Sequence, residues 1–230
     1  MVTGKTPDYP LVRAKTKYKL VAFDMDGTLI KTTSCWQKLH EHFGTEDLNA
    51  VNLKEFSEGR ISYDEFMKRD ITLWNPLPHV SRVKDALSDY ELHPNAKEVV
   101  KALKDAGIIT AIISGGVDVL AEMVAEELGI NFVIANGVET DYSGYLTGNG
   151  VCRVDIKQKG AVLEKLANDL GISPSHCIAV GDSKWDVDLL EAAGLGIGYN
   201  PDAELAKVAD KTISDLNEIL GIALQPKQEY

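Results

Sequence analysis

The chain has 230 residues, of which 44% are hydrophobic and 26% are charged. This composition is that of a globular protein and excludes extensive disorder, and the length suits one α/β domain that carries a small insert. The formal charge of -11 disfavours the concentrated basic face that nucleic-acid binding needs, so we expect no nucleic-acid partner.

The N-terminal segment, residues 1–16, contains basic residues but no apolar run of signal-peptide length. No segment approaches the roughly 20 apolar residues of a membrane span. The three cysteines, Cys35, Cys152 and Cys177, lie far apart and form neither a CxxC pair nor an even set for disulfides. We therefore expect a cytoplasmic protein without membrane contact, in which residues 1–16 form a loosely ordered arm.

The first strong pattern is the apolar run Leu20–Phe23, which breaks at Asp26 and Gly27. A short apolar run that ends in turn-forming residues is typical of a buried parallel strand followed by a polar loop. We predict such a strand over residues 18–24.

The next stretch, residues 32–90, has a helical pattern, in which apolar residues such as Trp36, Leu39 and Phe43 are three and four positions apart. Ser62, with a glutamate three residues later, has the form of a helix-opening capping box. Two prolines interrupt the pattern before residue 80. The stretch predicts about four short helices and no strand.

After residue 90 the predicted strands alternate with helices. We expect helices over residues 96–104, 118–128, 159–170, 185–193 and 216–220, strands over 108–113, 132–135, 176–180 and 195–199, and a hairpin within 137–154 that leaves the main sheet. Such alternation implies parallel strands joined by right-handed crossovers. The predicted fold is therefore α/β, with a Rossmann-like three-layer core over 17–31 and 91–222 and an inserted small helical cap over 32–90.

Polar residues directly follow three of the predicted strands. These segments are Asp24-Met25-Asp26-Gly27-Thr28, Ser114-Gly115-Gly116 and Gly181-Asp182-Ser183. Ligands of open parallel sheets bind beyond the carboxyl ends of the strands, so we expect the three segments to meet at one edge. Two carboxylates in one pocket call for a cation, and oxygen ligands beside a phosphate favour magnesium, with Asp24, Asp26 and Asp182 as its ligands.

These segments, together with Lys159 and Asp186, resemble the four motifs of the haloacid dehalogenase superfamily of phosphatases. The resemblance extends over about residues 17–220 and implies an Mg²⁺-dependent hydrolase that acts on a small phosphorylated metabolite. Within the superfamily the chain is most similar to the phosphoserine phosphatase branch. The helical insert directly after the first motif, the Ser-Gly-Gly second motif and the hairpin before Lys159 carry this closer similarity.

The resemblance assigns the chemical steps to three residues. It implies that Asp24 is the nucleophile, which forms an aspartyl-phosphate, and that Asp26 is the general acid and base, with its backbone carbonyl on the metal. Lys159 is then the residue that neutralises the charge of Asp24 and the transferring phosphoryl group. Lys157 is the rival candidate for that role, but only Lys159 directly precedes Gly160.

The resemblance also implies how the phosphoryl group and the metal are held. Thr28, Ser114 and the amide of Gly115 donate hydrogen bonds to the phosphoryl oxygens. Asp182 completes the metal site. Asp186 acts either in that site or from outside the set of metal ligands, where it orients Lys159 or a metal-bound water.

Three positions differ from the phosphoserine phosphatase pattern. Thr33 replaces a glutamate that grips the substrate amino group, Asp70 replaces a cap arginine that holds the substrate carboxylate, and Trp185 replaces an asparagine beside the phosphate. Candidate anion contacts from the cap side are Lys31, Arg60, Lys68 and Arg69. The physiological substrate and the oligomeric state stay open, and a phosphotransferase or phosphomutase and a non-catalytic metabolite-binding protein are the alternative functions.

Overall fold

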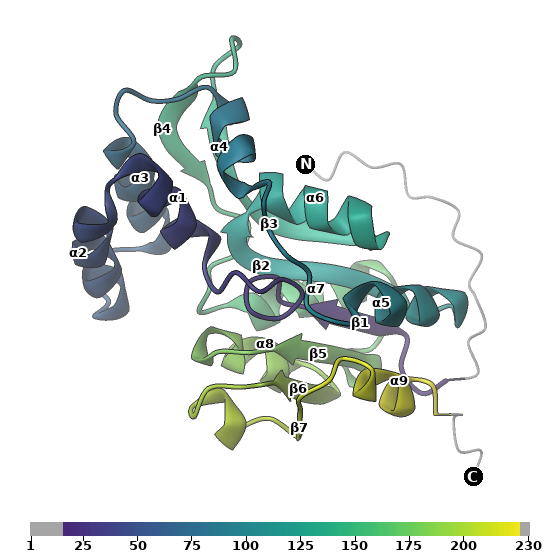
Figure 1. Cartoon of the computed structure of the whole chain (residues 1–230). Helices are drawn as coiled ribbons and strands as arrows, with labels where there is room; N and C mark the ends of the chain where they lie inside the picture. Colours follow the sequence, from purple (N-terminus) through teal and green to yellow (C-terminus); the bar gives the residue numbers. More distant parts are fainter. Residues whose placement is uncertain (1–15, 226–230) are drawn as a thin grey trace.

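A computed structural model of the chain describes residues 16–225, so the arm expected over residues 1–16 lies outside the described residues except for Thr16. Within residues 16–225, seven strands form one sheet in the order β4-β3-β2-β1-β5-β6-β7 (Figure 1). The strands are β1 (Leu20–Phe23), β2 (Ile109–Val117), β3 (Phe132–Thr140), β4 (Leu146–Val151), β5 (Cys177–Gly181), β6 (Leu195–Tyr199) and β7 (Lys211–Ile213). All neighbours pair in parallel except β3 and β4, which confirms the α/β fold.

Helices cover both faces of the sheet and give the predicted three layers. One face packs against α5 (Ala96–Asp105), α6 (Asp118–Leu128) and α9 (Glu218–Ala223), and the other against α7 (Lys159–Asp169) and α8 (Val187–Ala192). The central strand β1 shows why both faces of the sheet need helices to cover them. Val21 and Phe23 belong to the first apolar core and Leu20 and Ala22 to the second, because successive strand side chains point to opposite faces.

Four helices occupy the region between β1 and α5: α1 (Cys35–Phe43), α2 (Glu46–Ser57), α3 (Tyr63–Leu73) and α4 (Val80–Leu87). Figure 1 shows α1, α2 and α3 standing beyond the carboxyl ends of the central strands. The predicted capping serine is in place, since the Ser62 hydroxyl accepts a hydrogen bond from the Glu65 amide at 3.2 Å. The four helices α1–α4 are called the cap below.

The hairpin lies where the sequence predicted it, but its first strand is longer than expected. The strand expected to end at residue 135 continues to Thr140; it pairs with β2 as far as Asn136 and with β4 only from Gly137 onward, so the hairpin projects beyond the central strands as predicted (Figure 1). Strand β4 packs against α3, and a Cβ at Gly150 would lie 2.8 Å from Met67 Cε. The hairpin therefore belongs to the packing of the cap.

Two further elements differ from the sequence-based expectation. The predicted helix over 185–193 is split into a 3-10 turn, η2 (Lys184–Asp186), and α8, because the Asp186 side chain turns back onto the preceding backbone. Strand β7 was not predicted, since three residues carry no periodicity that can be measured. Two more 3-10 turns are η1 (Pro174–His176) and η3 (Leu205–Lys207).

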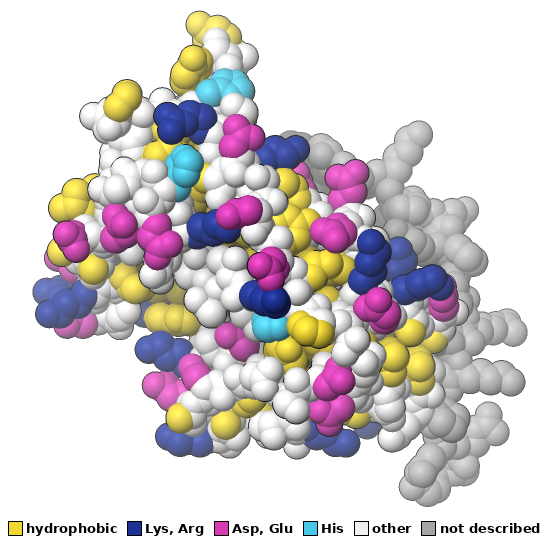
Figure 2. Space-filling model, in the orientation of Figure 1, with side chains coloured by type: hydrophobic (Ala, Val, Ile, Leu, Met, Phe, Trp, Pro, Cys, Tyr) yellow, Lys and Arg dark blue, Asp and Glu magenta, His cyan; other side chains and the backbone are white. Residues whose placement is uncertain are grey.

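Charged side chains and cysteines can be located within the part of the chain that the structure describes. Figure 2 shows acidic and basic side chains interspersed over the face that it draws. Cys35, Cys152 and Cys177 are free thiols. Among residues 16–225, no helix has the length and apolar character that crossing a membrane requires.

Candidate active site at the carboxyl edge of the sheet

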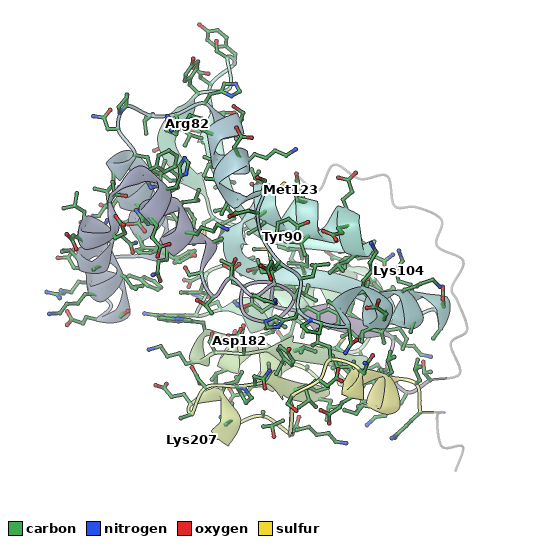
Figure 3. All side chains as sticks on the ribbon, in the orientation of Figure 1. Arg82, Tyr90, Lys104, Met123, Asp182 and Lys207 are labelled. Carbon is green, nitrogen blue, oxygen red and sulfur yellow. The ribbon has the colours of Figure 1, made fainter. Side chains whose placement is uncertain are left out.

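The predicted site residues come from three adjacent strands. Asp24 directly follows β1, Ser114 lies in β2, and Asp182 directly follows β5, while the sheet order places β1 between β2 and β5. Asp182 is labelled in Figure 3, near the loop that follows β1. The parallel register therefore brings together the three segments, as the sequence predicted.

The loop after β1 is shaped to pass close to Asp182. Gly27 has a φ of 75°, a conformation that favours glycine, and a Cβ at this position would collide with the Asp182 carboxylate. Next to it, the Thr28 hydroxyl donates to Asp182 Oδ1 at 3.1 Å. The first motif and the fourth are thus in direct contact across the edge of the sheet.

Three carboxylates form a cluster at this edge. One oxygen each of Asp24, Asp182 and Asp186 lies within 4.8 Å of the others. Asp186 is fully buried, and its Oδ2 accepts hydrogen bonds from the amides of Asp182 at 3.1 Å and Ser183 at 3.2 Å. The Asp26 carboxylate is oriented differently, because its Oδ2 accepts a hydrogen bond from the Cys35 amide at 2.8 Å.

Lys159 reaches this cluster from the start of α7. Its Nζ lies 3.0 Å from Asp24 Oδ1 and 2.6 Å from Asp186 Oδ1, and only 2% of the residue is exposed. Gly160 makes this approach possible, because its amide donates to Asp188 Oδ2 at 2.6 Å and a Cβ there would collide with α8. The rival Lys157 lies elsewhere, with its Nζ 3.1 Å from the Phe56 carbonyl oxygen.

Burial and mutual repulsion control the protonation of these groups. Burial, with a further contribution from Asp186, raises the pKa of Asp24 to about 8 and that of Asp182 to about 7. Burial also raises the pKa of Asp26. For Lys159, burial acts to lower the pKa, but the Asp186 and Asp24 carboxylates outweigh it and leave the pKa raised.

The charge balance of the cluster fits a cation. Three carboxylates share one ammonium group, and the raised pKa values show that the site resists carrying its full negative charge. A divalent ion relieves that repulsion, and a set of hard carboxylate oxygens suits Mg²⁺. The residues present thus fit the magnesium ion that the sequence predicted.

The second motif is held by residues that sequence reasoning did not assign to the site. The Ser114 hydroxyl accepts a hydrogen bond from the Gly116 amide at 3.1 Å. The Gly115 carbonyl accepts three: from Trp36 Nε1 at 3.0 Å, Tyr63 Oη at 2.9 Å and Asn136 Nδ2 at 3.1 Å. Segments from the cap and from β3 therefore fix the orientation of this peptide group.

Asn136 is a functional candidate that the sequence could have indicated. It is fully buried, and its Oδ1 accepts hydrogen bonds from the Arg153 and Val154 amides at 2.8 and 2.9 Å. It thereby links the Ser114 segment to the chain that leads into Lys159. It directly follows the predicted strand 132–135, the same position relative to a strand that singled out the other motifs. For Trp36 and Tyr63 no comparable local signal exists.

Two positions that differ from the phosphoserine phosphatase pattern do not provide contacts for the amino and carboxylate groups of an amino acid substrate. Thr33 is exposed at the start of the cap. Asp70 is fully buried inside the cap, where Asn49 Nδ2 and Asn52 Nδ2 donate to its carboxylate at 2.8 and 2.7 Å and His40 Nε2 lies at 3.3 Å. Asp70 thus serves the interior of the cap.

Trp185 packs between the core and the cap. Its ring centroid lies 6.1 Å from that of Phe56, at the end of α2. The half-buried indole therefore forms part of the contact between the core and the cap.

Most of the candidate cap-side cations are engaged by acidic neighbours. Lys31 lies 2.6 Å from Glu91, and Arg69 lies within 2.7 Å of both Glu55 and Glu65. Arg60 pairs with Glu58, while Lys68 is exposed on α3.

Similarity to known proteins is extensive. The model of the family described as haloacid dehalogenase-like hydrolase matches residues 18–194. A phosphoserine phosphatase of Methanocaldococcus jannaschii is 32% identical over 208 residues, which cover 89% of this chain and 97% of that protein. One of Archaeoglobus fulgidus is 34% identical over 206 residues, and there this chain spans only 59% of the relative.

Solved structures show the same similarity in three dimensions. A structure described as a phospho-aspartyl intermediate analogue of phosphoserine phosphatase matches with a TM-score of 0.76 and 30% identity, over 90% of this chain and 99% of that one. A substrate-bound phosphoserine phosphatase complex matches with a TM-score of 0.75 and 29% identity, over 90% and 98%.

Proposed function

The chain belongs to the haloacid dehalogenase-like hydrolase family, and from this we propose that it is an Mg²⁺-dependent phosphatase that hydrolyses a small phosphorylated metabolite through an aspartyl-phosphate on Asp24. The observation that carries the proposal is the buried contact of Lys159 with Asp24, 3.0 Å long, beside the carboxylates of Asp182 and Asp186. A structural ion pair would leave no reason for three carboxylates to gather around one lysine at the ligand-binding edge of the sheet.

In the first step, an Asp24 carboxylate oxygen attacks phosphorus and the bond between phosphorus and the ester oxygen breaks. Asp26 gives its proton to that oxygen, which leaves as an alcohol. The structure suits this role, because Cys35 holds one oxygen of Asp26 while the other, Oδ1, is buried without a hydrogen-bond partner among residues 16–225. Burial raises the pKa of Asp26 and favours the proton-carrying form that the step requires.

In the second step, the Asp26 carboxylate takes a proton from water, and the oxygen of that water attacks the phosphorus of the aspartyl-phosphate. Orthophosphate leaves and the Asp24 carboxylate is restored. Thr28, Ser114 and the Gly115 amide hold the phosphoryl oxygens, and Lys159 balances their charge.

The residues that would hold Mg²⁺ are Asp24, Asp182 and the backbone carbonyl of Asp26. When bound, the ion supplies positive charge that offsets the carboxylates and the phosphoryl group. Asp186 is better suited to orient Lys159 than to bind the ion, because both of its oxygens already accept hydrogen bonds from protein groups.

The substrate class follows from the family, but the individual metabolite does not. The named relatives are phosphoserine phosphatases. In this chain Thr33 is an uncharged, exposed residue and Asp70 is enclosed by the cap, so neither side chain supplies charge for the amino acid part of L-phosphoserine. We include in the proposal a cytoplasmic location, since the free thiols of Cys35, Cys152 and Cys177 suit a reducing compartment.

The test is phosphate release from L-phosphoserine, glycerol 3-phosphate, glucose 6-phosphate and p-nitrophenyl phosphate, with and without Mg²⁺. We expect turnover that requires the metal and that falls by about 10³-fold or more in Asp24→Asn, while the surface variant Asp105→Asn retains it. Turnover that persists in Asp24→Asn would contradict the nucleophile assignment. Phosphate transfer to an added alcohol instead of water would indicate a phosphotransferase, and a folded, metal-loaded wild type inactive on every substrate would indicate a binding protein.

A further inference from the structure

The carbonyl oxygen of Gly115 accepts more hydrogen bonds than its burial requires. Trp36 Nε1, Tyr63 Oη and Asn136 Nδ2 all donate to it, at 3.0, 2.9 and 3.1 Å. One donor satisfies a buried carbonyl, and its oxygen has only two lone pairs. Burial alone therefore does not account for the three donors.

These side-chain donors lie where the regular pairing of β2 is interrupted. Strand β2 pairs with β3 at Ile113 and again at Val117, but the register shifts between these two residues. Gly115 lies inside this irregular stretch, where the strand ladder does not dictate the direction of each peptide group. The orientation of the Gly115 carbonyl is therefore set by side chains.

The orientation of the same peptide group affects the Ser114 hydroxyl. The Gly115 carbonyl and the Gly116 amide belong to one planar unit, so donors that hold the oxygen also fix the direction of the N–H bond. The Gly116 amide donates to Ser114 Oγ at 3.1 Å. Because this bond occupies a lone pair of the Ser114 oxygen, the hydroxyl proton remains available for the phosphoryl group.

Two of the three donors belong to the cap. Trp36 lies in α1 with its ring stacked on Trp74, at a centroid distance of 6.0 Å. Tyr63 is the first residue of α3, and its ring centroid lies 5.2 Å from that of Phe56 in α2. Both donors are buried. The rings thus pack among aromatic residues of the cap region, while their polar atoms bind to β2 in the core.

We propose that Tyr63 and Trp36 are positioning residues, whose donors orient the Gly115 peptide group so that Ser114 can donate to a phosphoryl oxygen. Both act through Ser114 and not on the substrate itself. The hold on the phosphoryl group therefore depends on the position of the cap against the sheet. This inference rests on the proposed function, in which Ser114 binds a phosphoryl oxygen.

A double-mutant cycle with Ser114 separates this role from a merely structural one. Tyr63→Phe removes only the hydroxyl donor, and Trp36→Phe keeps an aromatic ring without the Nε1 donor. Each is combined with Ser114→Ala, and kcat/KM is measured with Mg²⁺ for p-nitrophenyl phosphate and glycerol 3-phosphate. The matched control is Tyr90→Phe, because Tyr90 Oη donates to Glu127 Oε2 at 2.7 Å in an exposed pair outside the site.

We expect Tyr63→Phe and Trp36→Phe each to lower kcat/KM by about fivefold, equally for the two substrates, because the phosphoryl group is common to both. In the Ser114→Ala background each should lower it by less than about twofold, because the hydroxyl through which they act is gone. Tyr90→Phe should change kcat/KM by less than about twofold in either background.

Two provisions keep the test decisive. Calorimetric binding of inorganic phosphate to the Mg²⁺-loaded protein gives the same cycle where a double variant turns over too slowly to measure. If Trp36→Phe does not fold, Tyr63→Phe decides the test, since it removes a single oxygen atom.

The same loss in both backgrounds would assign Tyr63 a structural role, and a loss confined to one substrate would mean direct contact with that substrate. Either result, or no loss at all in Tyr63→Phe, would overturn the positioning role while leaving the phosphatase proposal intact. Wild type that hydrolyses neither substrate would overturn the proposed function itself, and the role of Tyr63 and Trp36 with it.

Discussion

Lys159 Nζ lies 2.6 Å from Asp186 Oδ1, and both side chains are buried. Asp186 also accepts hydrogen bonds from two backbone amides through its other oxygen, so its position is fixed on both sides. The contact with Asp186 therefore holds the Lys159 ammonium group 3.0 Å from Asp24 Oδ1.

Replacement of Lys159 by methionine should lower kcat by about 10²-fold or more, because it removes the charge that balances Asp24 and the transferring phosphoryl group. Lys157→Met is the matched control, since Lys157 contacts Phe56 instead. Steady-state kinetics with p-nitrophenyl phosphate distinguish the two. Equal losses in both variants would mean that the lysine assignment is wrong.

Asp182 makes stability depend on pH and metal. Its pKa in the folded chain is about 7, above the ordinary value of 3.8, so the folded state binds more protons between these values. The metal-free protein should therefore lose stability as pH rises through this interval, and Mg²⁺ should raise the Tm more at about pH 8 than at about pH 5.

The variant Asp182→Asn tests the same dependence of stability on pH and Mg²⁺ by removing the carboxylate. The variant should be at least as stable as the metal-free wild type at about pH 8, because one repelling carboxylate is gone, and its Tm should no longer respond to Mg²⁺. Thermal unfolding with and without the ion gives both values. An unchanged response to Mg²⁺ would remove Asp182 from the ligand set.

Gly115→Ala should lower kcat/KM by about 10²-fold, because the added Cβ would collide with Ile156 Cγ2 and displace the segment that carries Ser114. Ile156→Ala removes the colliding group, so the double variant should regain part of the activity. A double-mutant cycle measures that coupling. Strictly additive losses would show that the two residues do not conflict.

Asp70→Ala should lower the free energy of unfolding by about 3 kcal/mol, because it leaves the donors of Asn49 and Asn52 unpaired in the cap interior. This corresponds to a Tm lower by roughly 6–12 °C. KM should stay within about twofold of the wild type, since Asp70 is enclosed by the cap. The exposed Asp64→Ala on the same helix is the control; a normal Tm with a changed KM would argue for substrate contact.

Much of the architecture could be predicted from local patterns. The apolar run Leu20–Phe23 indicated the central strand, and the turn residues after it and after residues 113 and 180 marked the edge where the site forms. Strand β7 and the length of β3 were missed, because short elements and edge strands draw their stability from pairing with a neighbour and leave little periodic signal of their own.

The sequence by itself determined which chemical groups are available and in what order they follow the strands, because that information is carried by residue type and by spacing along the chain. Only the tertiary structure decided how those groups are oriented: that Asp26 faces Cys35, that Asp70 is enclosed by the cap, and that the Gly115 carbonyl is held from distant segments. Such contacts join residues far apart in the sequence, and packing selects them only when the cap and the sheet come together.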